Sequence, residues 1–163
     1  NRPRTAASIR RSYIGARSRA EGAGFENIIN SACAYYCSIG LADVEKTPEP
    51  MKPIGSPDRA GRFIACYTKQ AQPDYKGVLR GGKAVNFEAK HTDSDRMTRT
   101  EKLGGIAFVL CSFSGRYFYR VPWAVWRDMK RLFGRKYITP ADLAEYRIRV
   151  AAPGVLLFLE GFV

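Results

Sequence analysis

The 163-residue chain has only one histidine, His91, and this scarcity limits the metal chemistry open to the protein. Metal centres and proton relays that need two or more imidazoles are excluded. The chain also lacks an apolar run approaching the ~20 residues that a membrane-spanning helix requires. Its first residues, Asn1 to Arg4, carry no apolar stretch typical of a signal peptide. We therefore expect a soluble, intracellular protein with no membrane partner.

The cysteines are few and irregularly spaced. No CxxC pair is present, although Cys33 and Cys37 are one helical turn apart. These two residues, Cys66 and Cys111 have mainly apolar neighbours, which predicts buried and reduced thiols. A zinc or redox role for Cys33 and Cys37 is the alternative interpretation.

Acidic residues are scarce relative to basic ones. The chain has 27 lysines and arginines against 15 aspartates and glutamates, a net charge of +12. A positive field of this size attracts polyanions, of which nucleic acid is the most common inside a cell. Residues 1–21 contain six arginines and no acid before Glu21, so we expect a basic arm that follows a phosphate backbone or remains solvated. A basic protein without catalytic activity would show the same charge.

Residue periodicity predicts a mixture of helices and strands. Apolar residues recur at helical spacing from Phe25 to Tyr36, and Gly40 ends this helix. Residues 41–46 form a short strand, and the proline-rich segment 47–70 is an inserted arm that includes a strand over 62–70. The expected later elements are a polar loop after Lys90, strands 106–111 and 116–121, a helix over 122–133, a short helix starting at Thr139, and strand 155–159. This order predicts an α/β domain around a mixed sheet.

The segment from Asp74 to Lys90 predicts a hairpin with a defined register. A three-residue loop, Arg80 to Gly82, sets Leu79 opposite Lys83 and therefore Asp74 opposite Glu88. This register separates an apolar face from a polar face, whereas a slip of one residue mixes the two.

Two opposed carboxylates repel each other unless a cation or a proton lies between them. A divalent cation with oxygen ligands, Mg²⁺ or Mn²⁺, resolves the repulsion between Asp74 and Glu88, and Lys90 brings a further positive charge. On a basic protein this set is suited to hydrolysing a phosphodiester. The alternative is an ordinary surface hairpin, in which Asp74 forms a turn and Glu88 and Lys90 lie on a solvated strand face.

The pair Pro73-Asp74 followed by Glu88-Ala89-Lys90 resembles the PD-(D/E)xK nuclease motif, and Gly24-Phe25-Glu26 resembles the start of that superfamily's first helix. The likeness extends, over about residues 22–160, to the RecU-type Holliday junction resolvases of Gram-positive bacteria and their phages. The segments that carry it further are residues 67–70, 74–77, 104–109 and 134–136. The resemblance implies a restriction-endonuclease-like mixed β-sheet flanked by helices, over residues 22–163, with segment 47–70 as an inserted stalk.

The resemblance also implies a function. It indicates a homodimeric, Mg²⁺-dependent endonuclease of the bacterial or host cytoplasm that resolves four-way DNA junctions in recombination and repair. Asp74 and Glu88 would bind the metal with the backbone of Ala89, Lys90 would be catalytic, and Glu26 would support the site. The DNA contacts expected are Lys52, Arg62, Lys69, Lys76 and His91.

One departure from the family pattern concerns the segment after Lys90, which is too short for the long helix that usually follows the motif. Two alternative functions stay open. One is a nuclease of the same superfamily that acts on another DNA structure, and the other is a basic DNA-binding protein with an inactive site. Intact Asp74, Glu88 and Lys90 argue against the second, because a binding protein has no need of opposed acids.

Overall fold

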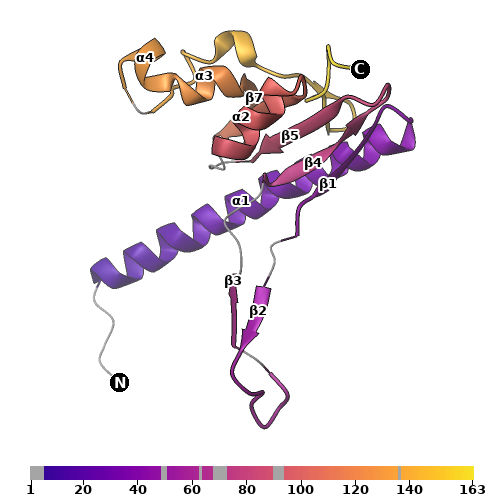
Figure 1. The fold of residues 1–163 in the computed structure, drawn as a ribbon. Helices are drawn as coiled ribbons and strands as arrows, with labels where there is room; N and C mark the ends of the chain where they lie inside the picture. Colours follow the sequence, from indigo (N-terminus) through magenta and orange to yellow (C-terminus); the bar gives the residue numbers. More distant parts are fainter. Residues whose placement is uncertain (1–5, 49–50, 63, 68–72, 90–93, 136) are drawn as a thin grey trace.

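The computed structural model describes residues 6–48, 51–62, 64–67, 73–89, 94–135 and 137–163. Within these residues five strands form one mixed sheet in the order β1-β4-β5-β6-β7 (Figure 1). The strands are β1 (Ala42–Lys46), β4 (Tyr75–Leu79), β5 (Ala84–Glu88), β6 (Ile106–Phe113) and β7 (Tyr117–Pro122). β5 and β6 pair in parallel and the other neighbours are antiparallel. The predicted α/β class, a mixed sheet flanked by helices as in restriction endonucleases, is confirmed.

Helix α1 (Ala6–Ser38) covers one face of the sheet, and its N-terminal part extends beyond the sheet edge (Figure 1). Phe25, Ile29 and Tyr36 are buried against that face. The helix ends in a Schellman motif, in which the Leu41 N–H donates to the Tyr36 carbonyl at 3.0 Å and Gly40 adopts φ +68°. Residues 6–20, which we expected only as an arm, are therefore the first turns of the same helix.

The opposite face of the sheet carries helices α2 (Ser94–Lys102) and α3 (Trp123–Arg127) (Figure 1). Met97 and Trp123 are buried there together with the β6 residues Ala107 and Val109. The expectation of a polar loop after Lys90 is wrong for residues 94–102. Met97 is the single apolar residue in α2, so no apolar stripe marks the helix in the sequence.

Between β1 and β4 the chain forms a hairpin of β2 (Met51–Ile54) and β3 (Ile64–Tyr67), here called the arm hairpin, which points away from the main sheet in Figure 1. The Asp58 carboxylate holds its turn by accepting hydrogen bonds from the N–H groups of Ala60 and Arg62, at 2.8 and 2.9 Å. Strand β3 is shorter than the predicted strand 62–70, of which residues 68–70 lie outside the described residues. Each strand of this two-stranded sheet is an edge strand. Strand β2 therefore tolerates Pro53, which has no N–H to donate to a neighbouring strand.

The C-terminal region departs most from the expected elements. The predicted helix 122–133 is two short helices, α3 and α4 (Met129–Phe133), separated at Asp128, whose side chain accepts a hydrogen bond from Arg131. The predicted helix start at Thr139 is instead a turn closed by the Asp142 carboxylate, before the 3-10 helix η1 (Ala144–Tyr146). A small hairpin of β8 (Val150–Ala151) and β9 (Val155–Leu156) replaces the strand expected over 155–159.

The cysteines are partly as expected. Cys33 is buried and Cys111 is half-buried, and burial raises the pKa of each thiol from 9.0 to about 12. Cys37 is exposed, contrary to the prediction, because it lies on the solvent side of the last turn of α1. The side chain of Cys66 lies outside the described residues. None of the helices in the described ranges is long and apolar enough to cross a membrane.

Candidate functional site

The β4–β5 hairpin has the predicted register. Tyr75 pairs with Phe87 and Lys76 with Asn86, and the Leu79 N–H donates to the Lys83 carbonyl at 2.9 Å. Gly81 and Gly82 supply the positive φ values, +95° and +85°, that the three-residue loop requires. The pairing ends at Tyr75 and Phe87, and one further step in the same register would set Asp74 across from Glu88.

Three chain segments meet at this edge of the sheet: the end of β1, the start of β4 and the end of β5. The Thr47 N–H donates to the backbone carbonyl of Asp74 at 2.8 Å. The Asp74 carboxylate in turn accepts a hydrogen bond from the Ala89 N–H, with Oδ2 and N 2.9 Å apart. Residues that are 15 positions apart are therefore fixed next to each other.

Glu88 is the most buried acidic side chain of this region, with a relative exposure of 1%. It alternates with Phe87 and Ala89, which are buried on the α1 side, so Glu88 belongs to the α2 side of the sheet. Burying a carboxylate is costly unless a cation or hydrogen-bond donors compensate for the lost hydration. The buried carboxylate of Glu88 therefore needs a compensating cation or hydrogen-bond donors, which a carboxylate on a solvated strand face would not need.

Glu26 reaches the same edge of the sheet from α1. Its carboxylate forms an ion pair with the Lys46 ammonium, with Oε2 and Nζ 2.6 Å apart and both side chains about half exposed. Burial raises the pKa of Tyr75, and the negative charges of Glu26, Cys33 and Asp74 add to that rise. These charges act on the Tyr75 hydroxyl, which donates a hydrogen bond to Asn30 Oδ1 on α1 at 2.9 Å.

The donor set at this edge fits a hard divalent cation such as Mg²⁺. Asp74 and Glu88 would supply carboxylate oxygens, and Ala89 would supply a backbone carbonyl. The buried hydroxyl of Thr47 has no hydrogen-bond partner among the described residues, so a further polar group would complete it. Within those residues no three His, Cys, Asp or Glu side chains cluster as metal ligands, so backbone oxygens and water would complete the coordination.

Comparison with known proteins bears on what this edge does. The model of the family described as "Recombination protein U" (RecU) matches residues 20–162, which include all three segments that meet at the edge. The chain belongs to the RecU family.

Individual relatives of this RecU-family chain carry the name "Holliday junction resolvase RecU". The protein of Bacillus pumilus is 31% identical over 145 residues, which cover 76% of this chain and 70% of the relative. The protein of Ligilactobacillus salivarius is 33% identical over an alignment of 165 residues, and the match covers 86% of this chain and 76% of the relative. The protein of Streptococcus gordonii is 35% identical over 111 residues, covering 57% and 55%.

The structure describes three of the DNA contacts that we expected for this RecU-family chain. Lys52 is exposed on β2, and the Arg62 guanidinium donates to the Asp58 carboxylate, with Nε and Oδ2 2.9 Å apart. Lys76 lies 3.8 Å from the Glu45 carboxylate, its neighbour across β1 and β4. The other two expected contacts, Lys69 and His91, lie outside the described residues, as does Lys90, the predicted catalytic lysine.

Sequence reasoning missed a group of polar and basic residues between β5 and α2. Asn86 donates a hydrogen bond to the Thr100 hydroxyl at 2.7 Å, and Arg96 and Arg99 lie on the same face of α2 as Thr100. The alternation along β5 already placed Asn86 on the face of Glu88. The partners on α2 were not predictable, because no helix was expected there.

Proposed function

We propose that this RecU-family chain is an endonuclease that resolves four-way DNA junctions in recombination and repair. The observation that carries the proposal is the contact between the Asp74 carboxylate and the Ala89 N–H, which joins the two halves of the acidic motif. Membership of the RecU family and the name carried by its relatives, Holliday junction resolvase, support the choice of substrate. The net charge of +12 provides the attraction to DNA.

Asp74, Glu88 and the carbonyl of Ala89 would hold Mg²⁺, for which Mn²⁺ can substitute. When bound, the metal ion supplies Lewis-acid polarisation of the phosphoryl oxygen and a lower pKa for a coordinated water. This assignment accounts for the hydrogen bond that ties Asp74 to Ala89 and for the burial of the neighbouring Glu88 carboxylate.

The protein groups have separate roles in the proposal. The Ala89 N–H orients the Asp74 carboxylate, and the rigid strand β5 fixes the direction of Glu88. Lys90, two residues after Glu88, would stabilise the negative charge that develops on the phosphate. Glu26 would be a positioning residue at the same edge, held there by its ion pair with Lys46 at the end of β1.

A homodimer is part of the proposal, because cutting two symmetric strands of a junction requires two symmetric sites. The arm hairpin would act as the stalk that enters the junction, with Lys52, Arg62 and Lys69 towards DNA. Its exposed surface and its projection from the sheet in Figure 1 support this role. The proposed location is the cytoplasm, where the substrate is found.

A cleavage assay tests the proposal. End-labelled four-way junction, linear duplex and single strands of the same sequence are incubated with the protein in Mg²⁺ or in EDTA. We expect paired nicks in the junction with Mg²⁺ only. Equal cutting of linear duplex would instead indicate another nuclease of the PD-(D/E)xK type. Binding without cutting in Mg²⁺ and in Mn²⁺ would contradict the enzymatic function.

A further inference from the structure

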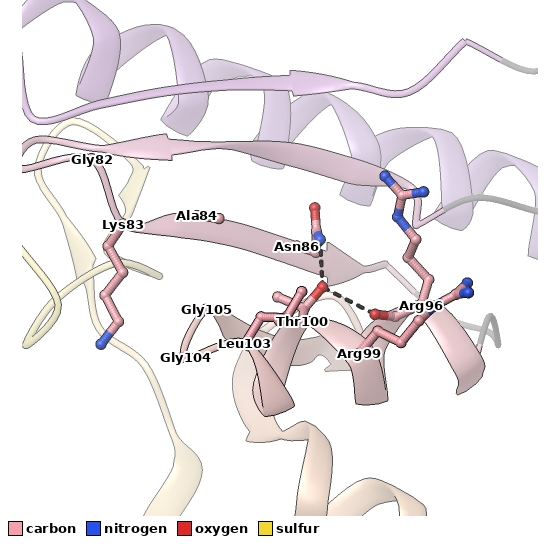
Figure 2. A pocket seen from close by; sticks show the side chains of 10 residues that line it. All are labelled: Gly82, Lys83, Ala84, Asn86, Arg96, Arg99, Thr100, Leu103, Gly104 and Gly105. Carbon is pink, nitrogen blue, oxygen red and sulfur yellow. Dashed lines mark hydrogen bonds between the residues drawn. The ribbon is translucent and has the colours of Figure 1, made fainter.

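A pocket of about 500 Å³ lies between the β4–β5 turn, strand β5 and helix α2 (Figure 2). Asn86 and Thr100 lie at its centre. Figure 2 shows Lys83 at one end, and Arg96 and Arg99 together at the other. We call this site the α2 pocket. Its volume is within the range of about 300–1,000 Å³ that is usual for ligand sites.

The lining of the α2 pocket favours an anion. Lys83, Arg96 and Arg99 contribute positive charge, and none of the described residues that line it is acidic. Lys76 lies beside Asn86 on the neighbouring strand and belongs to the same polar face of the hairpin. Arginine is especially suited to phosphate, because its planar guanidinium can donate two parallel hydrogen bonds.

The pocket is held by a fixed scaffold. The Asn86 amide donates to the Thr100 hydroxyl at 2.7 Å, and this hydroxyl donates to the Arg96 carbonyl at 3.0 Å, so α2 is tied to β5. On the other side of α2, Met97 is fully buried, and the Trp123 indole donates to the Thr98 hydroxyl at 3.0 Å. The basic side chains therefore project from a helix whose position is set by packing.

The contact at Gly105 brings α2 close to the sheet. A Cβ atom at Gly105 would lie 2.7 Å from Thr100 Cγ2 and 3.3 Å from the Ala84 carbonyl oxygen. Only glycine lets the end of α2 approach β5 this closely without a shift of either element. The floor of the α2 pocket is thus formed by closely packed chain segments. An ordinary charged patch on a surface has no such floor.

The pocket residue Asn86 lies on the same face of β5 as Glu88, one of the proposed metal ligands. Asn86 is two residues before Glu88 on β5, about 7 Å from it at a rise of about 3.4 Å per residue. Lys83 directly precedes β5, five residues before Glu88, which corresponds to about 17 Å in the direction of the strand. A strand of B-form DNA rises about 3.4 Å per nucleotide. With the DNA helix axis running along β5, the pocket therefore spans about two to five nucleotides from a phosphate held at Glu88.

We propose that the α2 pocket binds the backbone phosphates of the DNA strand that is cut, on one side of the cleavage position, with Lys83 and Arg99 as direct contacts. This inference rests on the DNA substrate proposed above and adds the path that the strand takes over the protein. Phosphate contacts position a nucleic acid without reading its sequence. The α2 pocket would hold the arm of the junction in register with Asp74 and Glu88.

The test compares two double variants of equal charge. Lys83→Gln with Arg99→Gln removes two charges from the pocket. Lys102→Gln with Arg116→Gln removes two exposed charges outside it, one of them on the same helix. Junction affinity is measured in EDTA from 50 to 200 mM salt, so binding is read without cutting. Thermal unfolding confirms that both double variants are folded.

The salt dependence gives the decisive result. Each lost phosphate contact lowers the slope of log K against log[salt] by about 0.9, so over this fourfold range wild type should weaken about 12-fold more than the pocket variant. The control variant should keep the wild-type slope. Equal slopes for the pocket variant and wild type, or equal losses in both double variants, would overturn the proposal.

Phosphate ethylation interference supplies a second readout that depends on position. With wild type, ethylation about two to five nucleotides from the cleaved phosphate should block binding, and the pocket variant should lose this sensitivity. Interference that persists unchanged in the pocket variant would contradict the assignment. If the junction is bound in this way but never cut, the proposed nuclease function fails and the pocket assignment stands.

Discussion

The carboxylate of Asp74 accepts a hydrogen bond from the backbone N–H of Ala89, 2.9 Å away. The contact joins the start of β4 to the peptide that directly follows Glu88. Its energetic contribution is modest, since a hydrogen bond to a charged group contributes about 1.5–3 kcal/mol. Its geometric effect is larger, because it fixes the direction of one proposed metal ligand relative to the other.

This contact predicts different results for two substitutions of Asp74. Asn keeps an oxygen that can accept from the Ala89 N–H, whereas Ala leaves that donor unpaired. We expect Asp74→Asn to cost less than about 1 kcal/mol of unfolding free energy and Asp74→Ala about 1–3 kcal/mol. Both should abolish junction cleavage and retain junction binding. Urea unfolding and cleavage assays measure the two effects, and cutting by either variant at the wild-type rate would contradict the role of Asp74.

Variants of the ion pair between Glu26 and Lys46 can separate the effect of Glu26 on cleavage from its effect on the stability of the fold. The two side chains are about half exposed, so breaking the pair should cost less than about 1 kcal/mol. If the Glu26 charge positions the site, Glu26→Gln lowers the cleavage rate by about tenfold or more, equivalent to 1.4 kcal/mol. Lys46→Met breaks the same pair but keeps the acid, so its rate should fall less.

Single-turnover cleavage of the junction and thermal unfolding check this prediction. A Glu26→Gln protein that cuts as fast as wild type would show that the carboxylate has no part in the reaction. A fall in unfolding temperature that accounts for the lost rate would show a structural role only.

Gly77 is required where β4 pairs with β1, opposite Val44. A Cβ atom at Gly77 would lie 2.1 Å from the Asp43 carbonyl oxygen and 2.6 Å from Val44 Cα, both of which are backbone atoms. We expect Gly77→Ala to destabilise the protein by about 2 kcal/mol or more, because the two strands must separate. The control is Gly24→Ala in α1, where an added Cβ meets nothing within 4 Å. It should stabilise by up to about 1 kcal/mol through helix propensity.

Chemical unfolding of both variants gives the comparison. A neutral effect of Gly77→Ala would mean that the contact between β1 and β4 is looser than the structure has it.

The buried thiols predict lower stability at alkaline pH. Burial raises the pKa values of Cys33 and Cys111 from 9.0 to about 12, so above pH 9 the unfolded chain releases protons that the folded chain retains. Unfolding free energy should therefore fall as pH rises from 9 to 12, by up to about 1.4 kcal/mol per pH unit for each thiol. Tyr75, whose pKa burial also raises, adds to the loss above pH 10.

Urea unfolding with a reductant at pH 8, 9 and 10 measures this slope. The double variant Cys33→Ala with Cys111→Ala should show a shallower fall than wild type. Identical slopes for the two proteins would contradict the assignment of the pH dependence to these thiols.

The sequence predicted the structure where a residue pattern is compatible with only one arrangement of the chain. The register of the β4–β5 hairpin was predictable because a slip by one residue would have buried the wrong face of the strands. The buried strand β6 was recognisable as a continuous apolar run, and Gly40 marked the end of α1. From these features the sheet edge that carries Asp74 and Glu88 could be predicted.

The sequence was insufficient where tertiary packing creates the structure. Helix α2 is stabilised by one buried side chain, Met97, and by the bond between Thr98 and Trp123, neither of which leaves a periodic signal. The break between α3 and α4 at Asp128 likewise depends on local hydrogen bonding. Because α2 was not expected, the α2 pocket could not be predicted from the sequence.

The most direct test of the account is the binding of Mn²⁺, measured by calorimetry in the absence of DNA. Wild type should bind the ion, and Asp74→Asn should bind it at least about tenfold more weakly, because one of two opposed carboxylates is lost. Asp43→Asn, which removes an exposed carboxylate on β1, is the matched control and should bind as wild type does. Wild-type affinity in Asp74→Asn would contradict the claim that Asp74 and Glu88 together hold a divalent cation.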